Sequence, residues 1–536
     1  MVNFGGQPLF EDVNVKFLPG NCYGIIGANG AGKSTFLKVL SGDLEPSAGH
    51  VEIPKNQRLA KLEQDQFKYD HLTALQTVYS GHKRFYEVYK ERDELYAKAE
   101  FTEEDGVRST ELEAEYADLN GYEAESEAGS LLSGLGVEES MHERIMGDLP
   151  AGVKVRVLLA QALFGQPDIL LLDEPTNNLD VETTAWLEDY LARTTALVIV
   201  VSHDRHFLNE VCTHIVDIDF RQLRIYVGNY DFWVKASELA LAQRRDQQRK
   251  NADKAKDLKA FIQRFSSNAS KARQATSRRK LLEKLTIDQL PVSTRRYPHI
   301  VFQSQRPCGK SVLTVNNLSA SLGDEVLFEN VSFTLFQGDK VAFVGQDSRA
   351  RTAFFQIIRG EREPDGGTFE WGSTITTSYF PKENEDYFDE VTLNLIDWLR
   401  QDGGEQWEES VRGYLGRMLF TGEDARKQAQ VLSGGERVRC MLARMMRVEG
   451  NVLIFDEPTN HLDLESITAL NNGLKIFSEV VLFSSHDREL VSTVANRIIE
   501  LAPKGAIDAR VDFEDYISSD SIRDQRRKLY GNHISL

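Results

Sequence analysis

Cysteine is scarce in this sequence: 536 residues contain four, Cys22, Cys212, Cys308 and Cys440. They lie far apart, which excludes the close spacing of a disulfide framework or a zinc site. Long apolar runs are also missing, and without about 18 consecutive apolar residues no segment is expected to span a membrane. The first residues lack the basic and then apolar stretch of a secretion signal. These absences predict a cytoplasmic protein without a membrane domain.

Basic residues are outnumbered, with 63 Lys and Arg against 82 Asp and Glu, a net charge of −19. A charge of this sign disfavours a nucleic-acid partner for the chain as a whole. The exception is the segment 241–296, where 16 basic residues face 5 acidic ones. Its net charge of +11 leaves −30 on the remainder of the chain. We therefore expect an anionic partner at this segment alone.

The segment 27–34 reads Gly-Ala-Asn-Gly-Ala-Gly-Lys-Ser, a full match to the phosphate-binding pattern G-x-x-x-x-G-K-[ST]. Apolar residues predict a strand over 23–26 and a helix over 35–40. Glycines let backbone N–H groups turn toward phosphates, Lys33 would reach the β- and γ-phosphates, and Ser34 would hold Mg²⁺. In this context the match predicts a nucleotide site rather than a glycine-rich turn that binds nothing.

The chain contains two copies of one sequence module. Residues 4–13 recur as 322–331 at an offset of 318, whereas 170–177 recur as 453–460 at an offset of 283. The first half therefore carries 35 extra residues. Charged helical patterns over 85–121 surround the expected breaker Glu104-Asp105-Gly106, so we predict an inserted helical hairpin, the arm. The alternative is a solvated surface excursion without a partner.

Each module carries an Asp-Glu pair at the end of an apolar strand. Asp173 fits a Mg²⁺ shell, and Glu174 fits the carboxylate that polarises an attacking water. His203 follows the next apolar run, where it could sense a γ-phosphate. In the second half, 432–436 reads Leu-Ser-Gly-Gly-Glu and opens a helical pattern, which predicts a second anion site at a helix N-terminus.

Phosphate loop, glutamine, Leu-Ser-Gly-Gly-Glu, Asp-Glu and histidine follow one another in the order found in ABC ATPases. The stretches 173–180 and 456–463, Asp-Glu-Pro-Thr-Asn-(Asn/His)-Leu-Asp, resemble the ABC-F family and most closely its YbiT-like branch. The resemblance implies an α/β fold with two P-loop ABC-type nucleotide-binding domains, each with an α/β core and a helical subdomain, joined by a basic helical hairpin. The expected segments are a first ATPase domain at 1–235 with the arm at about 82–122, a linker at 236–300, a second ATPase domain at 301–520 and a tail at 521–536.

In this family each ATP lies between the phosphate loop of one module and the signature of the other. The resemblance implies that Phe4 stacks on adenine and that Gln64 contacts Mg²⁺ and water. The residues expected to bind ATP at this first site are Phe4, Gly27, Asn29, Gly30, Ala31, Gly32, Lys33, Ser34, Thr35, Ser433, Gly434, Gly435 and Glu436. The expected catalytic residues are Glu174, His203 and Gln64, and the expected Mg²⁺ ligands are Ser34, Gln64 and Asp173.

The second site pairs two eroded motifs. Its loop, 345–352, reads Gly-Gln-Asp-Ser-Arg-Ala-Arg-Thr, so the planar guanidinium of Arg351 replaces a compact lysine. The first signature has Pro150, which lacks an N–H group, in place of serine. The residues expected there are Gly345, Arg351, Thr352, Asp456, Glu457, His486 and Gly152. We predict one hydrolytic site and one weak or non-hydrolytic site, with nucleotide binding at the second left open.

Between the modules, 240–265 predicts a helix, 266–270 a turn and 271–285 a returning helix. The residues expected to contact RNA phosphates are Lys271, Arg273, Arg278, Arg279 and Lys280. A solvated spacer is the alternative. The chain ends soon after the second module, so we expect no coiled-coil tail.

The resemblance implies an ATP hydrolase that uses ATP and Mg²⁺ and acts as a translation factor on the ribosome. It would bind rRNA and tRNA in the exit site as a monomer, with the linker near the P-site tRNA. Ribosome protection against antibiotics, the ATPase subunit of a membrane transporter and a nucleotide-gated scaffold remain alternatives.

Overall fold

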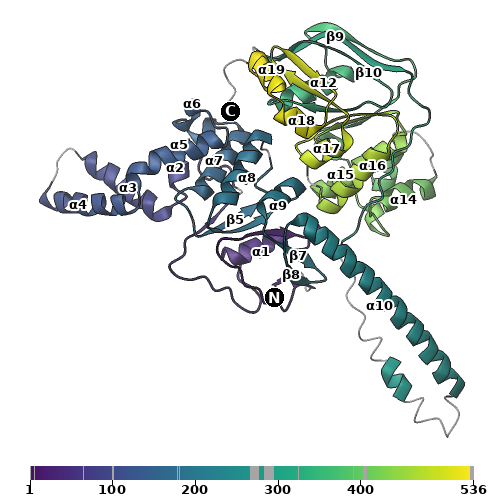
Figure 1. Ribbon diagram of the computed structural model, residues 1–536, viewed down its shortest axis with the longest axis horizontal. Coiled ribbons are helices and arrows are strands. Elements are labelled where there is room, and N and C mark those ends of the chain that lie inside the picture. Colours follow the sequence, from purple (N-terminus) through teal and green to yellow (C-terminus); the bar gives the residue numbers. More distant parts are fainter. Residues whose placement is uncertain are drawn as a thin grey trace.

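The computed structural model describes the chain except residues 1, 5–6, 64, 99–101, 178, 180, 266–276, 283–294, 324, 390, 402–406, 461 and 531–536. Two α/β halves lie side by side, the arm projects from the first half, and one long helix extends away from the junction between the halves (Figure 1). Each half has apolar clusters on both faces of its central sheet.

The first half is built on a six-stranded sheet in the order β4-β5-β6-β3-β7-β8, with β8 antiparallel to β7 and the other pairs parallel. The strands are β3 (Cys22–Ile26), β4 (Leu59–Lys61), β5 (Ile169–Asp173), β6 (Leu197–Val201), β7 (His214–Asp219) and β8 (Gln222–Val227). Every residue of β3 and β6 is buried, as expected of parallel strands covered on both faces. The carboxyl ends of β3, β5 and β6 therefore bring the phosphate loop, the Asp-Glu pair and His203 to one edge.

The second half repeats this topology in the order β13-β14-β15-β11-β16-β17. Its strands are β11 (Lys340–Val344), β13 (Thr377–Phe380), β14 (Val452–Asp456), β15 (Val480–Ser484), β16 (Arg497–Ala502) and β17 (Gly505–Ala509). A further sheet contains β9 (Ser311–Leu322), β10 (Glu325–Phe336) and β12 (Gly366–Trp371), and the first half has the pair β1 (Val2–Phe4) and β2 (Gln7–Phe10). The repeat and the α/β class expected from the sequence are thereby confirmed.

Helices cover both sheets. Those of the first half are α1 (Lys33–Leu40), α2 (Ala74–Tyr79), α5 (Ala124–Gly134), α6 (Glu139–His142), α7 (Ala151–Leu163), α8 (Val181–Arg193) and α9 (Arg205–Val211). Those of the second are α12 (Ser348–Ile358), α13 (Leu395–Arg400), α14 (Glu408–Arg417), α15 (Gly434–Val448), α16 (Leu464–Ile476), α17 (Arg488–Val494), α18 (Phe513–Ser518) and α19 (Asp520–Tyr530). Packing of α2, α5 and α7, and of α13, α14 and α15, forms a helical subdomain in each half.

The arm consists of α3 (Lys83–Tyr96) and α4 (Glu103–Asp118), which pack against each other. Ion pairs such as Arg84–Glu115 and Arg108–Glu91 (2.7 Å) join the two antiparallel helices. The expected breaker at 104–106 was wrong, because these residues form the first turn of α4. Thr102 caps this turn by accepting a hydrogen bond from Asp105 N (3.2 Å), which outweighs the low helix propensity of the glycine.

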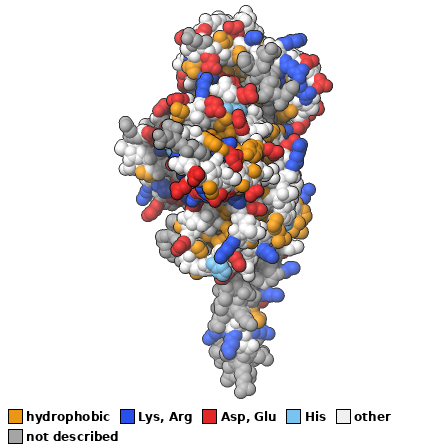
Figure 2. All heavy atoms as spheres, turned by 90° about the vertical axis from the view of Figure 1, so that its left-hand side faces the viewer, with side chains coloured by type: hydrophobic (Ala, Val, Ile, Leu, Met, Phe, Trp, Pro, Cys, Tyr) orange, Lys and Arg blue, Asp and Glu red, His pale blue; other side chains and the backbone are white. Residues whose placement is uncertain are grey.

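The long helix is α10 (Tyr230–Phe265), which at 1.5 Å per residue spans about 54 Å. It contains the predicted helix over 240–265 and begins within the stretch assigned to the first domain. Residues 277–282 are also helical, with Arg279 and Lys280 exposed and Arg278 half-buried. Lys271 and Arg273 lie outside the described residues. Blue basic side chains stand out on the projecting lower part of the molecule (Figure 2).

Candidate functional site

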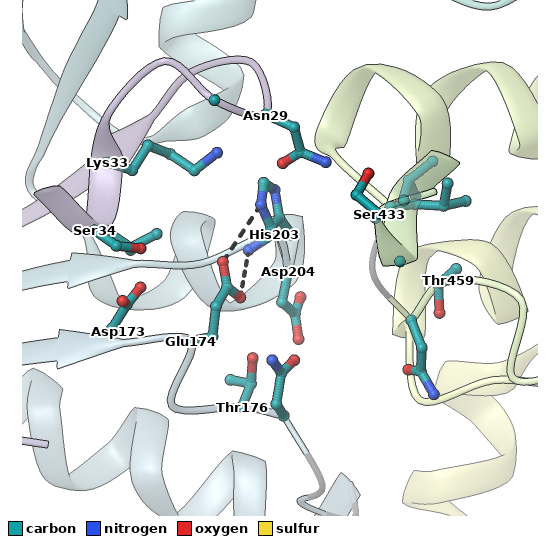
Figure 3. A pocket seen from close by; sticks show the side chains of 18 of the residues that line it. Asn29, Lys33, Ser34, Asp173, Glu174, Thr176, His203, Asp204, Ser433 and Thr459 are labelled. Atoms are coloured by element: carbon teal, nitrogen blue, oxygen red, sulfur yellow. Dashed lines mark hydrogen bonds and ion pairs between the residues drawn. The ribbon is translucent and has the colours of Figure 1, made fainter. Parts of the chain in front are cut away.

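A cleft of about 860 Å³ lies between the two halves and is lined by residues of both. The predicted site residues on its walls are Asn29, Gly30, Gly32, Lys33, Ser34, Thr35, Asp173, Glu174 and His203 from the first half and Ser433, Gly434, Gly435 and Glu436 from the second. Figure 3 shows the first-half side chains on one wall and Ser433 and Thr459 on the opposite wall. The loop of one half thus faces the signature of the other.

Gly27 and Ala31, two further predicted site residues, belong to the phosphate loop itself, where Ala31 N donates to Ala28 O (3.0 Å). Phe4 lies in β1, but its side chain is outside the described part of the structure, as is all of Gln64.

The loop between β3 and α1 depends on its glycines. Gly30 (φ 79°) and Gly32 (φ 99°) adopt left-handed conformations that favour glycine. A Cβ at Gly27 would lie 2.8 Å from Ile218 O, so the loop packs directly on the sheet. The ammonium of Lys33 donates to Gly27 O (2.8 Å). Burial lowers the pKa of Lys33, while Glu174 opposes the shift.

Glu174 and His203 lie against each other at the ends of β5 and β6. His203 N donates to Glu174 Oε2 (3.2 Å), and His203 Nε2 lies 3.4 Å from Glu174 Oε1. Burial raises the pKa of Glu174 to about 8 and lowers the pKa of His203 to about 3. A neutral imidazole therefore stands beside a carboxyl group of unusually high proton affinity, which suits a general base.

Two buried polar atoms in this pair have no hydrogen-bond partner among the described residues: Glu174 Oε1 and His203 Nδ1. Buried polar groups without partners are rare and need an explanation. Their position in the cleft is explained if a bound polar ligand completes the site. An attacking water would donate to Glu174 Oε1, and the imidazole of His203 would donate to a phosphate oxygen.

Ser34 and Asp173, two of the three residues expected to hold Mg²⁺, fit that ion. Ser34 and Asp173 line the main cleft and also a hollow of about 160 Å³, which Glu63 and Asp65, the neighbours of Gln64, line as well. The counterparts in the second half, Thr352 Oγ1 and Asp456 Oδ2, are 2.7 Å apart, so these two positions converge. A hydroxyl and one carboxylate, completed by phosphate oxygens and water, are ligands that Mg²⁺ prefers.

The opposite wall is formed by the N-terminus of α15. Both the backbone N and the Oγ of Ser433 donate to Glu436 Oε2 (2.9 Å each), so Glu436 holds the first turn together. Lys427 in turn donates to Glu436 Oε1 (2.9 Å). The free N–H groups and the dipole of this helix end favour an anion in the cleft.

In the second phosphate loop, Arg351 is turned inward. Its guanidinium donates to Gly345 O (2.6 Å) and to Glu457 Oε1 (2.9 Å), and His486 Nε2 lies 3.4 Å away. The side chains of Arg351 and Glu457 are 4% and 1% exposed. Burial alone would raise the pKa of Glu457, but His486 and Arg351 hold it below its usual value. The counterpart of Glu174, the residue expected to be catalytic, is therefore an ionised partner of arginine.

The remaining parts of the second site are also occupied by protein contacts or lie apart. Thr352 and Asp456 are hydrogen-bonded to each other, and Tyr530 of α19 packs against the loop, where its hydroxyl accepts from Gln346 N (3.4 Å). Gly152 in the first signature is exposed, and a Cβ built on it would have nothing within 4 Å. Among the described residues, therefore, no part of the second half lies against Gly152.

Sequence reasoning assigned no role to several residues at the cleft. Thr176, Asn177, Thr459 and Asn460 line it, and their duplicated Pro-Thr-Asn motif was the available signal. Arg205 joins the halves beside the cleft by donating to Glu489 Oε1 (2.7 Å), to Thr468 and to Leu464 O (3.4 Å). Its repeated Ser-His-Asp-Arg motif gave no hint of a contact between halves.

Two duplicated α/β halves, with a phosphate loop facing the other half's signature, define a tandem ABC-type ATPase. The family described as ABC transporter matches residues 10–177 and again 328–460, and its extension, also described as ABC transporter, matches 216–302. The chain belongs to the ABC ATPases and, within them, to the ABC-F family.

The relatives support this membership over nearly the whole chain. The uncharacterized ABC transporter ATP-binding protein YkpA of Bacillus subtilis is 54% identical, over 99% of this chain and 98% of the relative. The probable ATP-binding protein YbiT of Escherichia coli O157:H7 is 44% identical, over 97% and 98%. ABC transporter F family member 2 of Arabidopsis thaliana is 31% identical, over 98% and 79%. The YbiT-like assignment made from the sequence is confirmed.

A similar arrangement of the whole chain occurs in a solved structure, the archaeal ribosome recycling factor aABCE1 in complex with the ribosomal stalk protein aP1. The likeness covers 97% of this chain and 96% of that one, with a TM-score of 0.60 and 16% identity. At this identity the likeness concerns the fold. No helix in the described ranges is both long and apolar enough to cross a bilayer.

Proposed function

We propose that the chain hydrolyses ATP in the cleft between the first phosphate loop and the second signature. The observation that carries this proposal is the convergence of Lys33, Glu174 and Ser433, from two halves, on one cleft. Lys33 binds the β- and γ-phosphates, Glu174 accepts a proton from the attacking water, and His203 contacts the γ-phosphate. Ser34 and Asp173, with Gln64 as the third expected ligand, would hold Mg²⁺, which would neutralise phosphate charge.

The same geometry supports different roles for the two ATP sites. Because the walls of the cleft come from two halves, ATP bound there acts as a bridge, and its hydrolysis removes the bridge. The second site is proposed to be non-hydrolytic, since Glu457 is committed to Arg351 and Gly152 faces open space. One site thus drives opening and closing.

The proposed partner is the ribosome, contacted through the linker. Exposed basic residues lie along α10 and in the helical residues 277–282: Arg249, Lys250, Lys254, Lys256, Lys259, Arg279 and Lys280. They belong to a segment of net charge +11 in an otherwise acidic chain. Segregated positive charge on a projecting helix suits the phosphate backbone of RNA. A protein of the same tandem fold, aABCE1, is a ribosome recycling factor.

We further propose a role as a translation factor that binds in the exit site with the linker directed toward the P-site tRNA. The decisive experiment is sedimentation of the Glu174→Gln chain with ribosomes in the presence of MgATP at several salt concentrations. The test variant adds Arg278→Glu, Arg279→Glu and Lys280→Glu. Each lost RNA-phosphate contact should make the negative slope of log affinity against log salt concentration less steep by about 0.7–0.9.

The matched control reverses two exposed arginines of the first half that lie outside the linker, Arg193→Glu and Arg224→Glu. We expect it to bind ribosomes with the parent salt dependence. Unchanged binding of the linker variant would contradict the RNA assignment. Sedimentation of the parent with membranes instead of ribosomes would revive the transporter alternative.

A further inference from the structure

Five side chains meet where the linker leaves and re-enters the two halves: Asp217, Tyr230, Trp233, Arg295 and Glu465. We call them the linker-root cluster. Asp217 lies in β7 of the first half, and Tyr230 and Trp233 lie in the first turn of α10. Arg295 lies near the end of the linker, and Glu465 lies in the first turn of α16 in the second half. Both ends of the linker and both halves therefore contribute to one cluster.

Arg295 lies at the centre of the linker-root cluster. Its guanidinium donates to Asp217 Oδ1 (2.6 Å) and lies 3.5 Å from Glu465 Oε1. It also lies over the ring of Trp233, 4.4 Å from the centroid. The indole of Trp233 donates to Asp217 Oδ2 (3.3 Å), so the same carboxylate holds both ends of the linker.

Burial makes these contacts consequential. The side chains of Arg295, Asp217 and Glu465 are 11%, 12% and 4% exposed. A buried charge that loses one partner destabilises its surroundings far more than an exposed one. A planar guanidinium can serve two carboxylates and an aromatic face at once, which a lysine ammonium does not do. The position therefore calls for arginine.

The linker-root cluster borders the ATP cleft through the start of α16. Leu462 and Ile467, on either side of Glu465 in the chain, line the same cleft as Lys33. Asp463 caps α16 by accepting from Ser466 N (2.9 Å), which fixes this first turn. The start of α16 therefore borders the cleft and also contacts Arg295.

We propose that Arg295 is a positioning residue that couples the linker to the ATP cleft by holding the first turn of α16 against the root of α10. This inference rests on the proposed ATP site. Separation of the halves breaks the contact between Arg295 and Glu465 but leaves the contact between Arg295 and Asp217 within the first half and linker. Closure of the cleft and ordering of the linker root therefore share one contact. By thermodynamic linkage, a ligand that favours either favours the other.

The test is hydrogen–deuterium exchange on the full chain carrying Glu174→Gln, with and without MgATP. In this parent, MgATP should slow exchange both in the phosphate loop (29–37) and at the root of α10 (231–241). In Arg295→Met, we expect the loop to stay protected and the protection of the α10 root to fall by about fivefold or more, the lower end of ordinary coupling between sites. Arg224→Met, an exposed arginine of the neighbouring strand β8, is the matched control and should behave as the parent.

Glu465→Gln tests the same contact from the second half and leaves Arg295 paired with Asp217. It therefore keeps the proposal testable if Arg295→Met folds poorly. It should also lose the protection at the α10 root. Retained protection at that root in both variants would overturn the coupling. Joint loss of loop protection would also overturn it, because Arg295 would then serve nucleotide binding itself. A parent without loop protection in MgATP would refute the ATP site instead, which separates the two failures.

Discussion

Two substitutions at equivalent positions, Glu174→Gln and Glu457→Gln, should have opposite consequences. Each removes the carboxylate that follows the duplicated aspartate of its half, at the end of β5 or of β14. In the first half that carboxylate faces the cleft, and in the second it is bound to Arg351 (2.9 Å). We therefore expect Glu174→Gln to abolish turnover without loss of stability, and Glu457→Gln to lower stability while turnover persists.

The magnitudes follow from the two environments. A positioned general base contributes about 10²–10⁴-fold to a rate, so Glu174→Gln should lower ATP turnover at least about a hundredfold. Removal of one partner from a buried ion pair destabilises by about 3–5 kcal/mol. For a unit of about 200 residues this corresponds to a fall in Tm of about 6–20 °C at the second half. Turnover of Glu457→Gln, measured below that Tm, should stay within about twofold of the parent, because the second site is proposed to be non-hydrolytic.

The assay is steady-state phosphate release, combined with thermal unfolding of the same preparations. A control variant that combines Arg351→Gln with Glu457→Gln should recover most of the lost stability, since no buried charge is then left unpaired. Equal losses of turnover in Glu174→Gln and Glu457→Gln would refute the asymmetry. Unchanged stability in Glu457→Gln would refute the structural role of the Arg351 pair.

Two further predictions concern the same cleft. The pKa of Glu174 is raised in the folded chain from 4.5 to about 8. The contribution of Glu174 to stability is therefore complete below pH 4.5 and is lost as the pH rises toward about 8, so without nucleotide the Tm of Glu174→Gln should rise relative to that of the parent across this range. Parallel curves of Tm against pH for the two proteins would contradict the buried carboxyl group. Gly435→Asp places a carboxylate on the anion-binding wall and should lower turnover at least about tenfold, as expected for the loss of about 1.4 kcal/mol of transition-state stabilisation. Gly152→Asp, where space is open, should leave steady-state phosphate release unchanged. Equal effects of the two substitutions would contradict the pairing of the first loop with the second signature.

Local sequence patterns predicted the elements that carry the site. The strand over 23–26 and the helix over 35–40 agree with β3 and α1, because apolar periodicity and the glycine pattern act over a few residues. The breaker expected at Glu104-Asp105-Gly106 failed for a local reason too, since the capping chemistry of Thr102 starts a helix there. Comparison of the duplicated motifs also predicts which loop and which signature have lost functional groups.

The sequence by itself determined the two modules, the elements that carry the site and the chemistry available to each, because all of these depend on short-range order along the chain. Tertiary structure alone decided which groups meet. Arg351 reaches Glu457 across 106 residues and Tyr530 reaches Gln346 across 184, contacts that depend on the order of strands in the second sheet. The contact between Arg295 and Glu465 depends instead on the docking of the two halves and on the return of the linker. No pattern within a window of residues encodes such distances.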